Sequence, residues 1–235
     1  MSEFPFKTYV SVADRRAKAQ KKIAALSKTT PLSPVVLSGK KIATTWWGAA
    51  WCANLARYAD FANRIERGRA YVRNGQVIDL AIADGEVKAR VMGSRLYRVR
   101  IGIDGLSEAT WRKIVDSVGR RIADMAELAE GKFPEELGEI FMRQGDGLFP
   151  SPREIHMRCD CPDYADMCKH VAATLYGIGA RLDVSPLLFF KLRAIPFEAL
   201  LKKSVDEKMK SLLKNAGKQT DRVLRGEDID HIFRL

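Results

Sequence analysis

Three cysteines and one histidine lie close together between residues 159 and 170. Their sulfur and imidazole nitrogen atoms are the donors found in structural zinc sites, usually four of them arranged as a tetrahedron. The candidate ligands are Cys159, Cys161, Cys168 and His170. Because the protein supplies all four ligands, no coordination position remains for a substrate. The pattern therefore predicts one structural Zn²⁺ ion and no metal-based catalysis.

Other roles of clustered cysteines explain the pattern less well. A disulfide between Cys159 and Cys161 would close a strained loop, and disulfides are rare in the reducing cytoplasm where we expect this chain. Thiol redox centres usually separate their two cysteines by two residues. An iron–sulfur cluster with one histidine ligand is a further alternative. His156 is not expected to be a ligand, because on a strand it would face away from Cys159.

The residues around the ligands predict a strand followed by a helix. Residues 155–161 can extend as a strand, which would place Cys159 and Cys161 on one face. Residues 168–179 are expected to form a helix whose first turn carries the other two ligands, and the positive end of a helix favours thiolates. Such a short segment builds little core alone, so we expect zinc to replace part of the core.

The chain upstream of the ligands predicts an α+β fold in which helices pack on an antiparallel β-meander. Residues 42–65 carry aromatic side chains at helical spacing, so we expect a helix whose tryptophans pack in the core. Alternating apolar residues are bounded by Asn74-Gly75 and Asp84-Gly85, which are strong hairpin signals. The expected strands are residues 69–73, 76–83, 86–92 and 95–103.

Further helices are expected after the meander. Ser107 should begin a helix over residues 107–130 whose apolar stripe covers the inner face of the sheet, and a shorter helix is expected near residues 134–143. Cys52 is expected to be an inert thiol in the core. The expected parts of the chain are a basic N-terminal arm (1–39), an α+β domain (40–150), an appended zinc module (151–195) and a helical C-terminal segment (196–235).

The chain is strongly basic, with 40 Lys and Arg residues against 29 Asp and Glu residues and a formal net charge of +11. An excess of this size favours polyanionic partners such as nucleic acid. In the basic arm we expect a helix over residues 14–26 with Asp14 as its N-cap, ordered further by a partner. A solvated arm without a partner is the alternative. The arm's candidate phosphate contacts are Arg15, Arg16, Lys18, Lys21 and Lys22.

A second group of cations falls on one face of the expected sheet. Lys88 and Arg90 alternate with apolar residues on one strand, and Arg98 and Arg100 do so on the next, so the four can form one patch. A solvated sheet face usually carries mixed charge. This patch is nearly all positive, which favours contact with phosphates. Further candidates, on the first strand and beside the zinc ligands, are Arg69, Arg73 and Lys169.

The ligand pattern, Cys-x-Cys followed by Cys-x-His, closely resembles the SWIM zinc finger. Upstream segments are similar to bacterial SWIM zinc finger family proteins, namely residues 46–48 with Trp51, 67–75, 91–95 and 148–150. The resemblance implies a ββα-like zinc module that binds DNA or proteins. It also implies action with a larger machine such as a superfamily 2 helicase or translocase, with which bacterial members are associated.

Two function classes remain open. In the first, the chain is a zinc-stabilised nucleic-acid-binding accessory protein, with DNA favoured over RNA. In the second, the zinc finger and an amphipathic helix over residues 198–216 form a protein–protein adaptor. We expect no enzyme and no small-molecule substrate, because the sequence lacks a phosphate-binding glycine loop, a nucleophile elbow and a recognisable pair of catalytic carboxylates. Without a signal peptide or an apolar stretch of about 18 residues, we expect a cytoplasmic protein with no membrane partner.

Overall fold

The computed structural model describes residues 10–55, 62–118, 138–143, 146–163 and 165–196, and residues 202, 206, 209, 210, 213 and 214. The chain divides into two compact units, Met1–Phe197 and Glu198–Leu235, and the sheet and the helices α1 to α8 belong to the first. The latter part of the helix expected over 107–130 and most of the helix expected over 198–216 lie outside the described residues.

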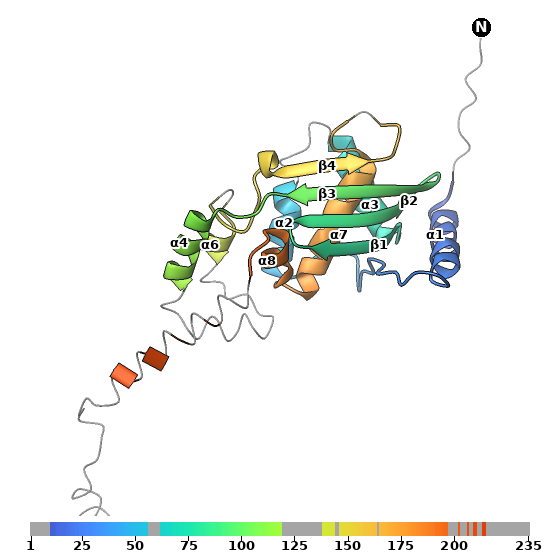
Figure 1. Cartoon of the computed structure of the whole chain (residues 1–235). Coiled ribbons are helices and arrows are strands. Elements are labelled where there is room, and N and C mark those ends of the chain that lie inside the picture. The colour runs from blue at the N-terminus through green and yellow to red at the C-terminus, as the bar shows by residue number, and fades with distance from the viewer. Residues whose placement is uncertain are drawn as a thin grey trace, which may run out of the picture. The chain divides into compact units, whose positions relative to one another are not determined.

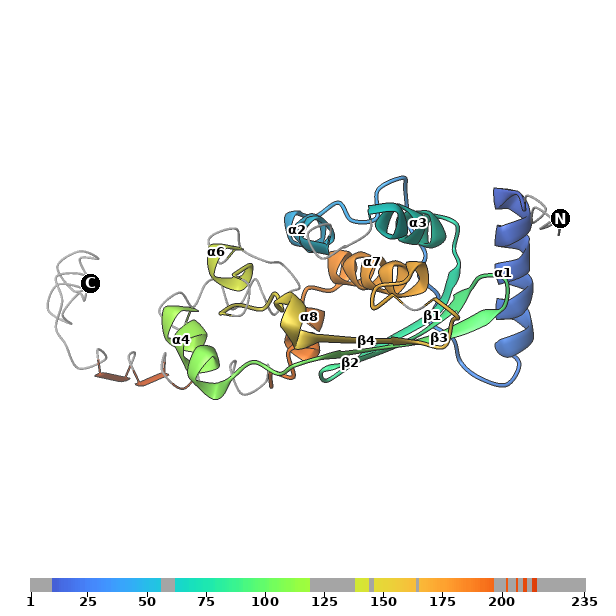
Figure 2. The same ribbon diagram turned by 90° about the horizontal axis from the view of Figure 1, so that it is seen from above.

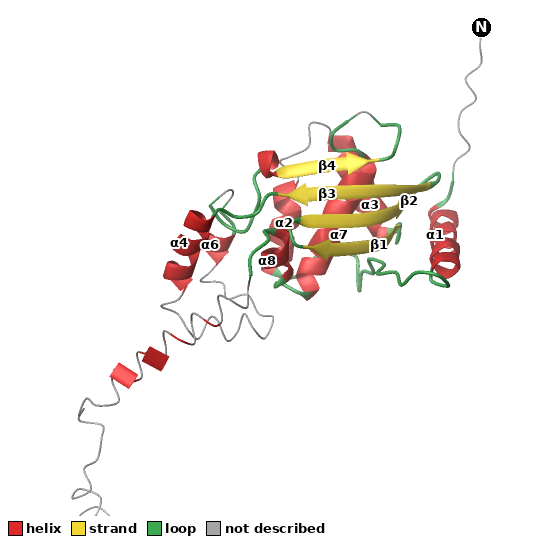
Figure 3. Cartoon of the chain, viewed as in Figure 1, coloured by secondary structure: helices red, strands yellow, loops and turns green. Residues whose placement is uncertain are grey.

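A four-stranded antiparallel sheet forms the centre of the first unit (Figures 1 and 3). Three strands follow one another as a meander: β1 (Val77–Ala83), β2 (Glu86–Met92) and β3 (Leu96–Ile103). The fourth strand, β4 (Ile155–Cys159), comes from the segment with the candidate ligands and pairs with β3. The expected α+β class is confirmed, and the strand that leads to the ligands belongs to the same sheet as the meander.

Three helices lie on one side of this sheet: α7 (Lys169–Val184) packs on the strands, and α2 (Trp46–Leu55) and α3 (Ala62–Arg73) pack on α7 (Figure 2). Most side chains of α7 are buried, because the helix lies between the sheet on one side and α2 and α3 on the other. The strands turn one apolar face toward α7, as the period of two in their sequences requires. The core of the protein is therefore the layer between α7 and the sheet.

The helix on the sheet is not the one that the sequence predicted. Ser107 does begin α4 (Glu108–Val118), and its Oγ accepts a hydrogen bond from the N–H of Thr110 (3.1 Å). However, the ring of Trp111 meets that of Phe190 edge to face, and the helix that contacts all four strands is α7. α7 is the helix that packs on the sheet, because a helix that is apolar on nearly all sides must be buried by several neighbouring elements. An amphipathic helix such as α4 has one apolar side and can bury it against a single neighbour.

Shorter elements complete the first unit. The helix expected near 134–143 is present as α6 (Gly138–Phe141). Of the helix expected over 42–65, α2 and the start of α3 are described, and residues 56–61 lie outside the described residues. A single 3₁₀ turn, η2 (Pro152–Glu154), precedes β4, and α8 (Leu188–Leu192) follows α7. The elements α6, η2 and α8 lie at the end of the sheet far from the candidate ligands (Figure 1).

Residues 69–73, expected as the first strand, are the last part of α3. Gly75 ends the helix in the left-handed conformation (φ 65°), and the N–H of Gln76 donates to the carbonyl of Tyr71 (2.9 Å), as in a Schellman C-cap. An Asn-Gly pair supplies a left-handed residue equally well to a hairpin and to a helix end. The second predicted hairpin turn, Asp84-Gly85, does join β1 to β2, and Gly85 adopts the left-handed conformation there (φ 67°).

The N-terminal arm contains a helix that packs on the rest of the chain. α1 (Val12–Leu26) begins at Ser11, whose Oγ accepts a hydrogen bond from the N–H of Asp14 (3.1 Å). The expected N-cap at Asp14 is therefore wrong, because the serine three residues earlier takes that role. Ala19 is buried in a cluster with Ile78 and Met92 at one end of the sheet. The helix is thus ordered by the chain itself, and not only by a partner.

Replacing Gly68 with alanine is expected to lower the free energy of unfolding by about 1–3 kcal/mol, as overpacking does. Gly68 lies where α3 meets α7, and an added Cβ would come within 2.6 Å of the Cβ of Ala172 and 2.9 Å of its carbonyl carbon. Urea denaturation of the two proteins measures the loss. Gly39→Ala is the control, because a Cβ at that site meets no atom within 4 Å. Equal midpoints for the two variants would contradict this close helix packing.

Candidate metal centre

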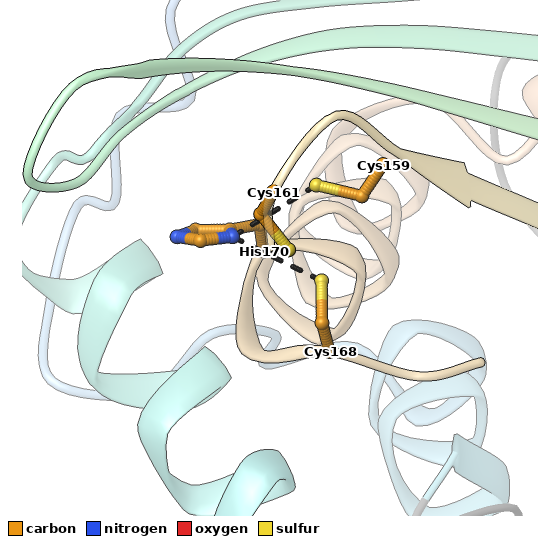
Figure 4. Close-up of side chains that lie close together, drawn as sticks. All are labelled: Cys159, Cys161, Cys168 and His170. Atoms are coloured by element: carbon orange, nitrogen blue, oxygen red, sulfur yellow. Dashed lines mark hydrogen bonds between the residues drawn. The ribbon is translucent and has the colours of Figure 1, made fainter. Parts of the chain in front are cut away.

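The four predicted ligands come together at one end of the sheet. Their donor atoms, three Sγ and one imidazole nitrogen, all lie within 4.8 Å of one another. Figure 4 shows the three sulfur atoms turned toward Nδ1 of His170, which lies 3.8 Å from Sγ of Cys159 and 3.9 Å from Sγ of Cys168. A zinc tetrahedron with bonds of about 2.0–2.3 Å separates S and N by about 3.6 Å. The cluster therefore has the size and the donors of a metal site.

Two elements supply the ligands. Cys159 is the last residue of β4, and Cys161 follows it in a bend, so the strand ends two residues earlier than expected. Cys168 is the N-cap of α7 in an extended conformation (φ −74°, ψ 167°), and His170 lies in the first turn of that helix. A strand end and a helix start thus face each other, as the sequence predicted.

The turn between the first two cysteines is anchored to β3. Asp160 exchanges two hydrogen bonds with the backbone of Arg98, since its N–H donates to the carbonyl (3.2 Å) and its carboxylate accepts from the N–H (2.9 Å). The guanidinium of Arg95 donates to the carbonyl of Asp160 (2.7 Å). The position of Cys159 and Cys161 is therefore set by the neighbouring strand.

The next turn is held by a helix. An ion pair joins Arg64 of α3 to Asp163 (2.8 Å), just after the second cysteine ligand. Both side chains are about one quarter exposed, so the pair is partly shielded from water. The loop that leads from Cys161 to Cys168 is therefore fixed to α3 as well as to β3.

The imidazole of His170 is held by two tyrosines. It stacks on the ring of Tyr97, with centroids 4.1 Å apart, and meets the ring of Tyr71 edge to face at 5.5 Å. Gly93 closes the remaining side, because a Cβ there would lie 3.1 Å from Nε2. Nε2 is buried and has no hydrogen-bond partner among the described residues. Ring packing, in place of the usual hydrogen bond to the second nitrogen, turns Nδ1 toward the sulfur atoms.

The thiols of the cluster influence one another strongly. The hydrogen bond from Cys159, helped by another from His170, lowers the pKa of Cys168 to about 3. The same hydrogen bond to Cys168, together with burial, raises the pKa of Cys159, and burial raises the pKa of Cys161. Three thiolates this close together would repel one another without a cation. A metal ion supplies that positive charge and releases the protons, so the donor set fits the predicted group.

The remaining cysteine and the neighbouring histidine lie outside the cluster. Burial raises the pKa of Cys52 to about 11, which keeps its thiol protonated at neutral pH. This half-buried side chain on α2 is therefore inert, as expected. His156 lies on the opposite face of β4, where its Nε2 contacts a carboxylate oxygen of Asp104 (2.8 Å).

The predicted sheet cations lie together on the face that the helices leave uncovered. Lys88 pairs across the strands with Arg100, and Arg90 with Arg98, so both pairs project from the same side. On β4, Arg158 pairs with Arg100 and continues the row. Arg158 was not among the predicted cations, although its position beside Cys159 on an expected strand places it on the face opposite the ligand. We call Lys88, Arg90, Arg98, Arg100 and Arg158 the cationic face.

The other predicted cations lie elsewhere. Arg69 is on α3, where its Nε donates to the hydroxyl of Tyr176 (2.8 Å), so the expectation that it extends the sheet patch is wrong. Arg73 also lies on α3, and its carbonyl accepts a hydrogen bond from the guanidinium of Arg16 (3.1 Å). Lys18 donates to the carbonyl of Ser94 (2.7 Å), which ties α1 to the turn before β3.

Four further predicted cations lie on α1 and α7. Lys21 and Lys22 lie on α1, the first exposed and the second half-buried, and Arg15 is half-buried on the same helix. Lys169 is half-buried in the first turn of α7, between two of the ligands. The structure thus separates the basic arm from the cationic face and leaves Lys169 at the metal centre.

One known protein shows clear similarity to the chain. The sequence is 39% identical over 163 residues to "Uncharacterized protein Rv2102" of Mycobacterium tuberculosis. The match covers 68% of this chain and 58% of that protein, so the chain spans less than two thirds of its relative. No protein-family model and no solved structure matches the chain. None of the helices that the structure describes is long and apolar enough to cross a bilayer.

Proposed function

We propose that the protein is a zinc-stabilised nucleic-acid-binding accessory protein directed at DNA. In this proposal the ligand cluster is a SWIM-type zinc finger that binds one structural Zn²⁺ ion. The observation that carries the proposal is the cationic face, where side chains from three adjacent strands gather on the side of the sheet opposite the cluster. Cations that are fixed on a sheet can contact phosphates without a large loss of backbone entropy.

The metal centre supports the cationic face through adjacent residues. Arg158 precedes the ligand Cys159 on β4, and the backbone of Arg98 holds the turn at Asp160. A metal ion that fixes this turn therefore also fixes the strands from which both arginines project. The zinc in this proposal is structural, and the protein binds its target without performing a reaction.

The proposal also includes a protein partner and a location. By resemblance to the SWIM family, the protein acts in the cytoplasm together with a larger machine such as a superfamily 2 helicase or translocase. Mass spectrometry of proteins that copurify with the full chain tests this part. Recovery of a translocase only in samples with intact DNA would indicate that DNA links the two proteins.

Replacing Arg98 and Arg100 together with glutamine is expected to weaken DNA binding and to flatten its salt dependence. The intact chain should bind with a Kd of roughly 10⁻⁴–10⁻⁶ M or tighter near physiological salt. Each lost phosphate contact lowers the slope of log K against log salt by about 0.9, so the double variant should lose about 2. Fluorescence anisotropy with labelled DNA, at salt concentrations from about 50 to 200 mM, measures both quantities.

A matched double variant controls for the loss of charge. Lys41→Gln with Arg143→Gln removes the same charge from exposed positions before α2 and after α6. These two helices lie on the helix side of the sheet (Figure 2), so the slope should stay near that of the intact chain. Equal losses in the two double variants would show that only net charge matters. Absence of binding by the intact chain would favour the protein–protein adaptor.

A further inference from the structure

The cationic face has no Phe, Tyr or Trp side chain with which to stack bases, and the imidazole of His156 on the same face of β4 is held by the carboxylate of Asp104 (2.8 Å). Across the four strands, Tyr97 is the one Phe, Tyr or Trp residue. It points to the helix side, where it is buried and stacks on His170. Proteins that bind single strands without sequence preference rely on aromatic side chains, and each stacked base contributes about 1–3 kcal/mol. The cationic face offers charge without this contribution.

The cations stand in rows that cross the strands. One row runs from Lys88 through Arg100 to Arg158, and the second joins Arg90 to Arg98. Neighbouring strands are about 4.8 Å apart, so the first row spans about 10 Å, and the second row lies about 7 Å further along the strands. The minor groove of B-DNA is about 6 Å wide. A row of this width reaches the phosphates of both strands that border the groove.

The positive charge is strongest on the side of the metal centre. Glu86 lies 2.8 Å from the ammonium of Lys88, and Asp79 lies 3.5 Å from the guanidinium of Arg90, so acids partly neutralise the cations of β2. Arg98, Arg100 and Arg158 form no ion pair within the part of the chain that the structure describes, and all three are exposed. Phosphate binding should therefore centre on β3 and β4.

We propose that the cationic face binds the double helix through both of its backbones, and that it binds single strands more weakly. This inference rests on the proposed function and names the form of DNA that the protein recognises. The row from Lys88 to Arg158 is wide enough to contact both lines of phosphates that border a groove. A single strand presents one line of phosphates and exposes bases for which this face has no Phe, Tyr or Trp side chain. The contacts are to backbone, so binding is independent of base sequence.

The first test compares a labelled duplex of about two helical turns (~20 base pairs) with each of its separate strands. In matched salt, the full chain should bind the duplex at least about tenfold more tightly. Arg158→Gln should weaken duplex binding and lower the salt slope by about 1, whereas Arg143→Gln should change neither. Equal or tighter binding of the single strands would overturn this inference and leave DNA binding in place. Absence of binding to either form would overturn the proposed function as well.

The second test adds the missing aromatic side chain. Ala81 is exposed on β1 and pairs with Lys88, so Ala81→Trp places a ring among the cations. Stacking should then raise the affinity for single strands roughly tenfold, with little change for the duplex. Ala53→Trp, at an exposed position of α2 on the helix side, should leave both affinities unchanged. Unchanged single-strand affinity in Ala81→Trp would show that the lack of aromatic side chains is not what weakens single-strand binding, and would overturn that part of the proposal.

Discussion

Replacing Cys168 with serine is expected to reduce the metal content from one zinc ion per chain to none and to destabilise the protein strongly. Cys168 is buried at the start of α7 and has the thiol with the lowest pKa of the cluster. Structural zinc contributes on the order of 10 kcal/mol to small modules. Even half of that contribution would lower the Tm by more than about 10 °C in a chain of this size.

The damage should nevertheless be local. α7 keeps its packing on the sheet, because residues such as Leu175 and Ile178 are fully buried without any help from the metal. The part expected to open is the stretch from Cys159 to Cys168, and with it the hydrogen bonds between Asp160 and Arg98. A zinc ion at this site would hold one end of a larger core together, whereas the sequence predicted that zinc replaces part of the core of a small module.

Metal analysis by mass spectrometry and amide hydrogen exchange check these two expectations. Cys52→Ser is the matched control, since it removes a thiol outside the cluster and should retain one zinc ion per chain. Full zinc content in Cys168→Ser would contradict the ligand assignment. Loss of exchange protection throughout α7 would contradict the expectation that only the stretch from Cys159 to Cys168 opens. It would instead support the prediction from the sequence that zinc replaces part of the core of this region.

Replacing Trp51 with alanine is expected to lower the free energy of unfolding by about 3–5 kcal/mol without loss of zinc. The indole is only 1% exposed and packs edge to face on Phe149 and Phe189, at 5.8 and 6.0 Å. Its N–H donates to the carbonyl of Leu175 on α7 (3.0 Å). Truncation removes all of these contacts and leaves a cavity between α2 and α7.

The smaller change Trp51→Phe separates the contribution of ring packing to the free energy of unfolding from that of the indole hydrogen bond. It keeps an aromatic ring but leaves the carbonyl of Leu175 without this donor, which should cost about 1–3 kcal/mol. Urea denaturation of both variants gives the two losses, and metal analysis should find one zinc ion per chain in each. Equal stability of Trp51→Ala and the intact protein would contradict the central place of this side chain in the core.

The features that the sequence predicted correctly are local. The clustering of the four candidate ligands depends on spacing between residues 159 and 170, and the β2–β3 hairpin depends on strict alternation, so short-range rules suffice for both. At Asn74-Gly75 these short-range rules do not predict the preceding element. The pair specifies a left-handed residue, but whether a helix or a strand precedes it depends on the fit of Gly68 against α7, a contact that is distant in sequence.

The features that the sequence did not predict depend on competition between distant segments. Two apolar helices could cover the sheet, and α7 does so because nearly its whole circumference is apolar. The pairing of β4 with β3 likewise placed Arg158 beside Arg100. Neither outcome can be read from a single segment, since each one depends on which partner buries more apolar surface.

The order of the strands also has a consequence for the rate of folding. β3 ends at Ile103 and β4 begins only at Ile155, so their pairing must close a long loop, which is a slow step. The metal ligands, by contrast, are neighbours in the chain. We therefore expect a zinc ion at this site to join β4 to α7 before the sheet is complete, so that the meander pairs with β4 and packs on α7 in a single step. For this topology we expect the ion to speed folding as well as to slow unfolding.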